Sequence, residues 1–390
     1  MMKFNMNSPT PIYFECGLFD RLSEFEFPGK NALIVLSDDH IAQRFSLLER
    51  LTEQLDAMGI RYSVFDGVQP NPIVENVMDG SEIARKNQCD FIIGLGGGSV
   101  MDCAKAISLL ATNDGNYWDY VEGTRIIEKP RIPVVTIPTT AGTGTEIAPF
   151  FVITNEEKNE KVGFPKPMRY NTWPVLSIID PALTATVPPE FTAYQGFDAF
   201  AHCVESFLSK KANAMSNMYS LACVEAVSGY LAAAVHNGGD LEARSRLSFA
   251  SVCSGVVMSV GSSTSKHSLE HAMSAYHNEL PHGAGLLMIC RAYYRKLISK
   301  QVLNERFVEL ARAMGKRDAS APEDFVAELD KLMHICGVNE LKMSDYGISP
   351  DEFEKYINNA RTTSIGYLFN SDSVILSDED CMDIYRESYK

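Results

Sequence analysis

A cluster of histidines is the strongest chemical signal in this chain. Four of its eight histidines fall close together, at His267, His271, His277 and His282. His267 and His271 are four residues apart, so they would share one face of a helix, and Asp198 and His202 repeat that spacing upstream. Neutral imidazoles with one carboxylate suit Fe(II) or Zn(II), and the absence of cysteine argues against a structural zinc clip. We therefore predict a metal site made by Asp198, His202, His267 and His282.

Such a site would provide chemistry as well as binding. A divalent ion with three neutral imidazoles and one carboxylate keeps a positive charge, which an alkoxide would neutralise. The ion would therefore lower the pKa of a bound alcohol, or polarise a carbonyl in the reverse direction. Next to a nicotinamide, this arrangement would support hydride transfer.

Two loops have the composition of nucleotide-binding turns. The first, residues 96–99 with the sequence GGGS, follows an apolar run and precedes a stretch with helical spacing. Glycines allow a sharp turn and a close approach to a pyrophosphate, and the amides of a helix start favour its charge. The second loop, residues 138–146 with the sequence PTTAGTGTE, follows another apolar run. Ordinary turns are the alternative, but two such loops at the ends of parallel strands predict a ligand crevice.

An acidic pair ends the first predicted strand. The apolar residues 32–36 lead into Ser37-Asp38-Asp39. A carboxylate at this place, with Asp38 as the candidate, would accept hydrogen bonds from a ribose 2′-hydroxyl and repel a 2′-phosphate. The pattern favours NAD and leaves NADP open, while an Asp-Asp start of the next helix is the competing interpretation.

Proline distribution and periodicity describe the scaffold that must position these residues. Fifteen of the eighteen prolines lie between Pro9 and Pro189, where short β-rich runs alternate with amphipathic stretches. This rhythm predicts a Rossmann-like parallel sheet covered by helices. Later residues have helical spacing, so we predict an α/β domain over 1–185 and an all-helical domain over 186–390. The predicted strands are 32–37, 61–67, 91–97, 133–138 and 175–180, and the predicted helices between them include 40–58, 73–88 and 99–111.

Composition narrows the class of protein. The 390 residues carry 35 Lys and Arg against 50 Asp and Glu, a net charge of −15, which would repel nucleic acid and anionic lipid. No apolar run reaches the roughly 18 residues of a membrane span, and no export signal is found. Nine scattered cysteines without a C-x-x-C pair indicate reduced thiols. We expect a cytoplasmic homodimer or larger homo-oligomer with no nucleic-acid or membrane partner.

Several longer motifs stand in one order along the chain. They are FDGVQPNP at 65–72, CDFIIGLGGGS at 89–99, PTTAGTGTE at 138–146, IIDPALTATVPPE at 178–190, GFDAFAHCVESFLS at 196–209 and LPHGAGL at 280–286. With this set the chain resembles the iron-containing (group III) alcohol dehydrogenase family over nearly its whole length. The resemblance implies a dinucleotide-binding α/β domain, an all-helical domain and a metal in the cleft between them.

The resemblance also implies roles for single residues. Carried over by position, it implies the same four metal ligands. His271, one turn after a ligand, would lie beside the substrate and relay its proton. The cofactor, expected to be NAD, would contact Asp38, Asn71, Gly97, Gly98, Ser99, Asp102, Thr139, Thr140 and Thr143.

The chain departs from the family pattern in ways that bear on the substrate. One residue more than in many members precedes His282, and His277 is an extra imidazole. Lys266 occupies a place that is commonly small or apolar, and Lys166 and Arg169 lie near the expected domain junction. These cations suggest an anionic or polyhydroxylated substrate, such as the sugar acid 3-deoxy-octulosonate (Kdo). Solvated surface charges are the alternative interpretation.

These observations predict a metal-dependent, NAD(P)-linked oxidoreductase that interconverts a primary alcohol and its aldehyde. A dehydroquinate-synthase-like enzyme, which uses NAD transiently, is one alternative, although it would need more Lys and Arg for a substrate phosphate than this chain offers. A non-catalytic nucleotide-binding protein with a structural histidine cluster is the other.

Overall fold

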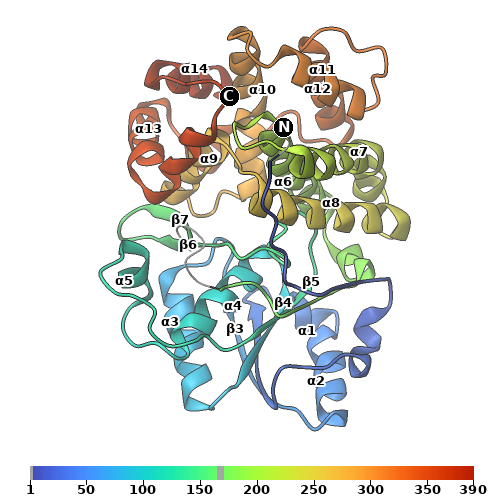
Figure 1. The fold of residues 1–390 in the computed structure, drawn as a ribbon, viewed down its shortest axis with the longest axis vertical. Coiled ribbons are helices and arrows are strands. Elements are labelled where there is room, and N and C mark those ends of the chain that lie inside the picture. Colours follow the sequence, from blue (N-terminus) through green and yellow to red (C-terminus); the bar gives the residue numbers. More distant parts are fainter. Residues whose placement is uncertain (1–2, 165–170) are drawn as a thin grey trace.

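The chain forms a layered α/β half and a helical half, which lie one above the other in Figure 1. The computed structural model describes residues 3–164 and 171–390, apart from the side chains of residues 364 and 365. The predicted fold class, a parallel α/β domain followed by a helical domain, is confirmed.

The α/β half is built on a six-stranded sheet in which every pairing is parallel. Its strands are β1 (Ile12–Phe14), β2 (Asn31–Ser37), β3 (Arg61–Val68), β4 (Phe91–Gly96), β5 (Val134–Pro138) and β8 (Leu176–Ile179), in the order β1-β8-β5-β4-β2-β3. The chain adds β3 on one side of β2 and then β4 on the other, so the direction of strand order reverses between β2 and β4. Ligands of open α/β sheets bind at the carboxyl ends of strands that flank such a point.

Alternating side chains along β2 explain the two helical layers. Leu33 and Val35 pack in one apolar cluster with side chains of α3 (Val74–Lys86) and α4 (Gly98–Leu110). Ile34 and Leu36 pack on the opposite face with side chains of α2 (Leu47–Ala57). A strand covered on both faces must be apolar throughout, which is why such runs were recognisable in the sequence.

Three features of this half were not predicted. The short strand β1 has three exposed residues and no periodicity to detect. The expected helix over 40–58 is interrupted, with α1 (Ile41–Arg44) separated from α2 by Ser46 at φ 53°. A hairpin of β6 (Phe151–Asn155) and β7 (Glu160–Phe164) forms a separate antiparallel sheet that packs between α4 and the helical half. The remaining α-helix described in this half is α5 (Tyr117–Glu122), and short 3-10 helices also occur, at Leu18–Asp20, Leu22–Glu24 and Pro181–Thr186.

The second half contains one large apolar core. In the described residues after 186, every named element is a helix, and the α-helices are α6 (Pro189–Leu208), α7 (Ala214–His236), α8 (Leu241–Val260), α9 (Ser265–Tyr276), α10 (His282–Ser299), α11 (Asn304–Ala313), α12 (Glu323–Ile335), α13 (Phe353–Thr362) and α14 (Asp378–Ser388). By length and composition alone α7 would pass as a membrane span, but it packs against α6 and α8 as a core helix does. The division of the chain at residue 185 stays a prediction.

Candidate active site

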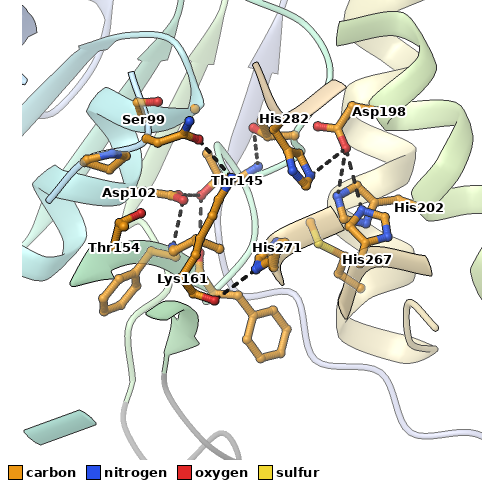
Figure 2. A pocket seen from close by; sticks show the side chains of 18 residues that line it. Ser99, Asp102, Thr145, Thr154, Lys161, Asp198, His202, His267, His271 and His282 are labelled. Atoms are coloured by element: carbon orange, nitrogen blue, oxygen red, sulfur yellow. Dashed lines mark hydrogen bonds and ion pairs between the residues drawn. The ribbon is translucent and has the colours of Figure 1, made fainter. Parts of the chain in front are cut away.

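Asp198 and three imidazoles meet where the helical half faces the sheet, as Figure 2 shows. Asp198 and His202 lie one turn apart on α6, His267 lies in the first turn of α9, and His282 begins α10 directly after Pro281. The Nε2 atoms of His202, His267 and His282 lie 3.4, 3.7 and 3.5 Å from Asp198 Oδ1. Ligand atoms of Asp198, His267 and His282 all lie within 4.8 Å of one another, and His202 is outside this compact group.

The spacing and the lack of other partners fit a metal ion. Asp198 Oδ1 and His267 Nε2 are buried and have no hydrogen-bond partner in the described part of the chain. Ligands about 2.1 Å from a shared ion at tetrahedral angles lie about 3.4 Å apart, close to the separations found around Asp198. Burial would raise the pKa of Asp198, but His202 and His282 hold it well below its usual range, so this carboxylate is ionised.

Each of these imidazoles uses its other nitrogen for a supporting hydrogen bond. The Nδ1 partners are Ser263 Oγ at 2.8 Å for His202, Glu205 at 2.9 Å for His267, and Glu270 for His282. Both glutamates are fully buried, and burial alone would raise their pKa values. His267 lowers the pKa of Glu205 to about 2, and His282 does the same for Glu270. Carboxylates of this kind orient ligand rings and increase their basicity.

A pocket of about 130 Å³ joins this cluster to the sheet. All four predicted metal ligands line it, together with His271. Of the predicted cofactor contacts, the pocket is lined by Asn71, Gly98, Ser99, Asp102 and Thr143, whereas Asp38, Gly97, Thr139 and Thr140 lie outside it.

The two predicted loops interlock at the pocket edge. Because β4 and β5 are neighbours, their loops lie side by side, and Thr139 N–H donates to Gly96 O at 2.9 Å. A Cβ atom at Gly98 would lie 2.5 Å from Thr143 Cγ2, and one at Gly97 would lie 3.2 Å from Thr140 Cγ2. The packing therefore requires glycine at position 98 and is tight at position 97. Helix α4 starts at Gly98, and its first amides face the carboxyl edge of the sheet.

The two aspartates that follow β2, Asp38 and Asp39, differ in their hydrogen bonding. Asp39 Oδ1 accepts hydrogen bonds from Ser37 Oγ at 2.6 Å and from Ile41 N–H at 3.0 Å, so Asp39 supports the start of α1. Asp38 is exposed, and no ion pair or side-chain hydrogen bond involves it in the ranges described. The competing interpretation, an aspartate at a helix start, therefore holds for Asp39. Asp38 remains available to a ribose.

Asp102 and Lys105, near the start of α4, form a largely buried polar group beneath the second loop. Asp102 accepts hydrogen bonds from Thr145 Oγ1 at 2.5 Å and from Val152 N–H at 2.8 Å, and burial raises its pKa to about 6. Lys105 is fully buried, and its Nζ donates to the carbonyl oxygens of Thr145, Ala148 and Phe150 at 2.5, 2.8 and 2.9 Å. Asp102 and Lys105 therefore hold the loop of residues 138–146 and the start of β6 in place from the interior of the fold.

His271 lies beside Lys161 of the hairpin strand β7 (Figure 2). His271 Nδ1 is 3.2 Å from the backbone carbonyl oxygen of Lys161, which can only accept, so Nδ1 carries the proton. Burial, and next the Lys161 ammonium group, hold the pKa of His271 well below its usual range. Lys161 Nζ donates to Asn71 Oδ1 at 2.9 Å and lies 3.9 Å from Glu270 Oε2.

Asn71 connects the two halves of the chain. It has φ 52°, and its Nδ2 donates to the carbonyl oxygens of Asn278 and Leu280 at 2.8 and 3.2 Å. These bonds hold the loop that leads into His282. The side-chain amide of Asn71 is thus already engaged by protein groups on both atoms.

Two departures from the family pattern, Lys266 and His277, lie away from the pocket. Lys266 is 1% exposed and turns away from the pocket into the core of the helical half, because adjacent helical positions point about 100° apart. This overturns Lys266 both as a substrate contact and as a surface charge. His277 lies 3.1 Å from Glu352 and 2.8 Å from Tyr356 Oη, away from Asp198. Lys166 and Arg169 lie outside the described residues.

Sequence reasoning missed Glu205, Glu270 and Lys161. A signal existed for the glutamates, since each follows a predicted ligand by three residues on the same helix, but each supports an imidazole from another helix. Lys161 lies in a strand with no motif and gave no signal.

The parallel sheet is of the nucleotide-binding type, and its carboxyl edge faces a buried cluster of one aspartate and several histidines. This combination defines the class of protein, a metal-dependent oxidoreductase. The chain matches the family descriptions "Iron-containing alcohol dehydrogenase" over residues 9–181 and "Fe-containing alcohol dehydrogenase family, C-terminal" over residues 192–389. It therefore belongs to the iron-containing alcohol dehydrogenase family, as its sequence motifs predicted.

Individual relatives agree with that assignment. The chain is 34% identical over 342 residues to alcohol dehydrogenase 4 of Schizosaccharomyces pombe, covering 86% of this chain and 78% of the relative. It is 31% identical over 341 residues to an NAD-dependent methanol dehydrogenase of Bacillus methanolicus, covering 85% and 86%. The crystal structure of an archaeal halo-thermophilic Red Sea brine pool alcohol dehydrogenase matches with a TM-score of 0.89 at 26% identity, covering 100% of this chain and 99% of that chain.

Proposed function

We propose that this protein uses a divalent metal and NAD(P) to interconvert a primary alcohol and its aldehyde. The observation that carries the proposal is the convergence of three imidazole Nε2 atoms on the unpartnered oxygen of Asp198, in a pocket whose other wall is the glycine and threonine loops. The metal ligands would be Asp198, His202, His267 and His282. His202 would be the fourth ligand, and it lies outside the compact group that the other three ligands form.

The chemistry is shared between the bound groups and the protein. When bound, Fe(II) or Zn(II) would act as a Lewis acid on the hydroxyl or carbonyl oxygen, and the nicotinamide would accept or donate the hydride. His271 would move the proton. Its Nδ1 proton is engaged by a carbonyl oxygen, so Nε2 holds the lone pair, and its lowered pKa keeps the ring neutral. A neutral ring with a free Nε2 lone pair can accept a proton at that atom.

The protein would hold the cofactor by its backbone more than by charged side chains. Gly98, Ser99 and Thr143 border the pocket, and the packing of the loops allows a close approach to the α4 N-terminus. Gly97, Thr139 and Thr140 would build the loops that make this approach available. Asp38 would bind the adenosine ribose and favour NAD over NADP. Asp102 would support the nicotinamide side of the pocket through Thr145 and Val152.

The substrate we favour is a small uncharged primary alcohol. Phe150, Phe151 and Met258 contribute apolar surface to the pocket. Among the described residues, Lys161 is the one lysine that lines it, and it already faces Glu270 at 3.9 Å. A sugar acid such as Kdo would have to share that lysine with Glu270. A panel of aliphatic alcohols, diols and sugar acids, assayed for NADH formation, decides the point, and higher kcat/KM for a sugar acid would reverse our preference.

Metal analysis combined with turnover tests the proposal. We expect the purified protein to contain Fe or Zn, and Asp198→Ala and His282→Ala to lose the metal and at least about 1000-fold of kcat/KM. His236→Ala, at an exposed position on α7, is the matched control and should behave as the parent. Net accumulation of NADH with aldehyde would distinguish the enzyme from one that uses NAD transiently. Full turnover by the Asp198 variant, or cofactor binding without turnover on any alcohol or aldehyde, would defeat the proposal.

A further inference from the structure

Lys266 is a buried cation that the proposed reaction does not use. Its side chain is 2% exposed, and its Nζ lies 3.8 Å from Glu205 Oε1. On its other side is a small cavity of mostly apolar side chains that includes Phe200 and Tyr294, and the Tyr294 ring centroid lies 5.6 Å from Nζ. Among the residues whose side chains are described, Glu205 is the sole acidic group in an ion pair with Lys266.

A charge at this place requires a physical reason. An ammonium group removed from water loses several kcal/mol of hydration, and one long ion pair with one aromatic ring recovers only part of it. A methionine of similar length would fill the same apolar space without that cost. The charge of Lys266 is therefore better explained by what it does for Glu205 than by packing.

Glu205 is held at several points behind the candidate metal centre. Its Oε2 accepts hydrogen bonds from Thr264 N–H at 2.9 Å and from Thr264 Oγ1 at 3.0 Å, at the start of α9. Both of its carboxylate oxygens lie 2.9 Å from His267 Nδ1. The orientation of the His267 ring, and thus the direction of its Nε2, depends on where this carboxylate stays.

The other buried glutamate has the same kind of partner. Glu270 bonds to His282 Nδ1 and lies 3.9 Å from Lys161 Nζ. The imidazoles of His267 and His282, two candidate metal ligands, are thus each hydrogen-bonded to a glutamate, and these glutamates lie 3.8 and 3.9 Å from a lysine. Lys161 lines the pocket, whereas Lys266 is closed off from it and cannot touch a substrate.

We propose that Lys266 is a positioning residue for the candidate metal centre. Its charge balances Glu205 from behind and holds the carboxylate against His267 Nδ1, so that His267 Nε2 stays directed at Asp198. Without Lys266, Glu205 is a buried anion with no countercharge on that side. The inference rests on the proposed metal site and adds to it a residue that acts only through Glu205.

The test measures zinc affinity of the metal-free protein by competition with a chromophoric chelator, so it does not depend on turnover. Lys266→Met should weaken Zn(II) binding by about 10- to 100-fold, the usual effect of removing a group behind a metal ligand. Glu205→Gln should weaken it as well, and the double variant should be no weaker than the weaker single variant. Cys290→Ala removes a side chain from the same cavity without changing charge, so it should bind zinc as the parent does.

Three outcomes separate the possibilities. Parent-like zinc affinity of a folded Lys266→Met protein, or effects of the two substitutions that simply multiply, overturns the inference because residues that do not interact act independently. If circular dichroism shows that Lys266→Met does not fold, the double variant is compared with Glu205→Gln, and a further tenfold loss overturns the inference. If the parent protein itself binds no zinc or iron, the proposed function fails instead.

Discussion

The buried carboxylate of Asp372 predicts a pH dependence of stability whose sign and magnitude follow from the structure. This carboxylate is 3% exposed, its Oδ1 accepts a hydrogen bond from Ser265 N–H at 3.0 Å at the start of α9, and its Oδ2 has no partner within the described ranges. Burial raises its pKa from an ordinary 3.8 to about 7, while the Ser265 amide opposes this, Glu205 adds to it and Lys210 opposes it. Between about pH 4 and 7 the native state therefore binds a proton that the unfolded state releases.

The stability contributed by this proton must fall as pH rises. The rise of the Asp372 pKa from 3.8 to about 7 amounts to roughly 4 kcal/mol of stability, present below pH 4 and lost by about pH 7. At about 2.1 cal/mol/K per residue, the 390 residues give an unfolding entropy of about 0.8 kcal/mol/K, so the loss corresponds to about 5 °C in Tm.

Asp372→Asn removes the titration and keeps the shape. Its Oδ1 can still accept from Ser265, and its amide takes the place of the unpartnered Oδ2. We expect the Tm of the variant relative to the parent to rise by about 3 °C between pH 5 and pH 8, because part of the loss has already occurred at pH 5, measured by differential scanning fluorimetry with chelator present. Asp318→Asn, at a side chain that is 89% exposed, is the control and should show no such trend. Parallel Tm curves of parent and Asp372→Asn across this pH range would refute the reasoning.

Three further predictions follow from the cofactor side of the pocket. Asp38→Gly should raise kcat/KM for NADP at least about tenfold relative to NAD, because a carboxylate beside a 2′-phosphate is repulsive, and an unchanged cofactor ratio would contradict this role. Gly98→Ala should raise the KM for the cofactor more than tenfold, because its Cβ would lie 2.5 Å from Thr143 Cγ2, whereas Gly229→Ala meets no atom within 4 Å and should be neutral. Lys105→Met should destabilise the protein by about 3 kcal/mol, since three buried carbonyl oxygens lose their donor, and a Tm within 1 °C of the parent would argue against it.

The sequence already contained the parts of the site that local geometry controls. Helical spacing predicted that Asp198 shares a face with His202, and that His267 shares one with His271, and both pairs lie on helices. Glycine and threonine at the ends of apolar runs predicted two loops at one edge of a parallel sheet, where β4 and β5 place them. These inferences succeed because the periods of helices and strands are properties of the chain itself.

Contacts between distant elements were decided by the tertiary structure. Glu205 and Glu270 each support an imidazole on a different helix, Lys161 reaches the pocket from an unpredicted hairpin, and Asn71 binds the loop before His282. Lys266 lies next to a predicted ligand in sequence, but its side chain points away from the pocket into a separate small cavity. The chain's composition and periodicity therefore determined the class of protein and the candidate metal ligands. The packing angles of α6, α9 and α10 decided which side chains support those ligands. These angles depend on side-chain fit across the whole core, which the sequence of one helix does not reveal.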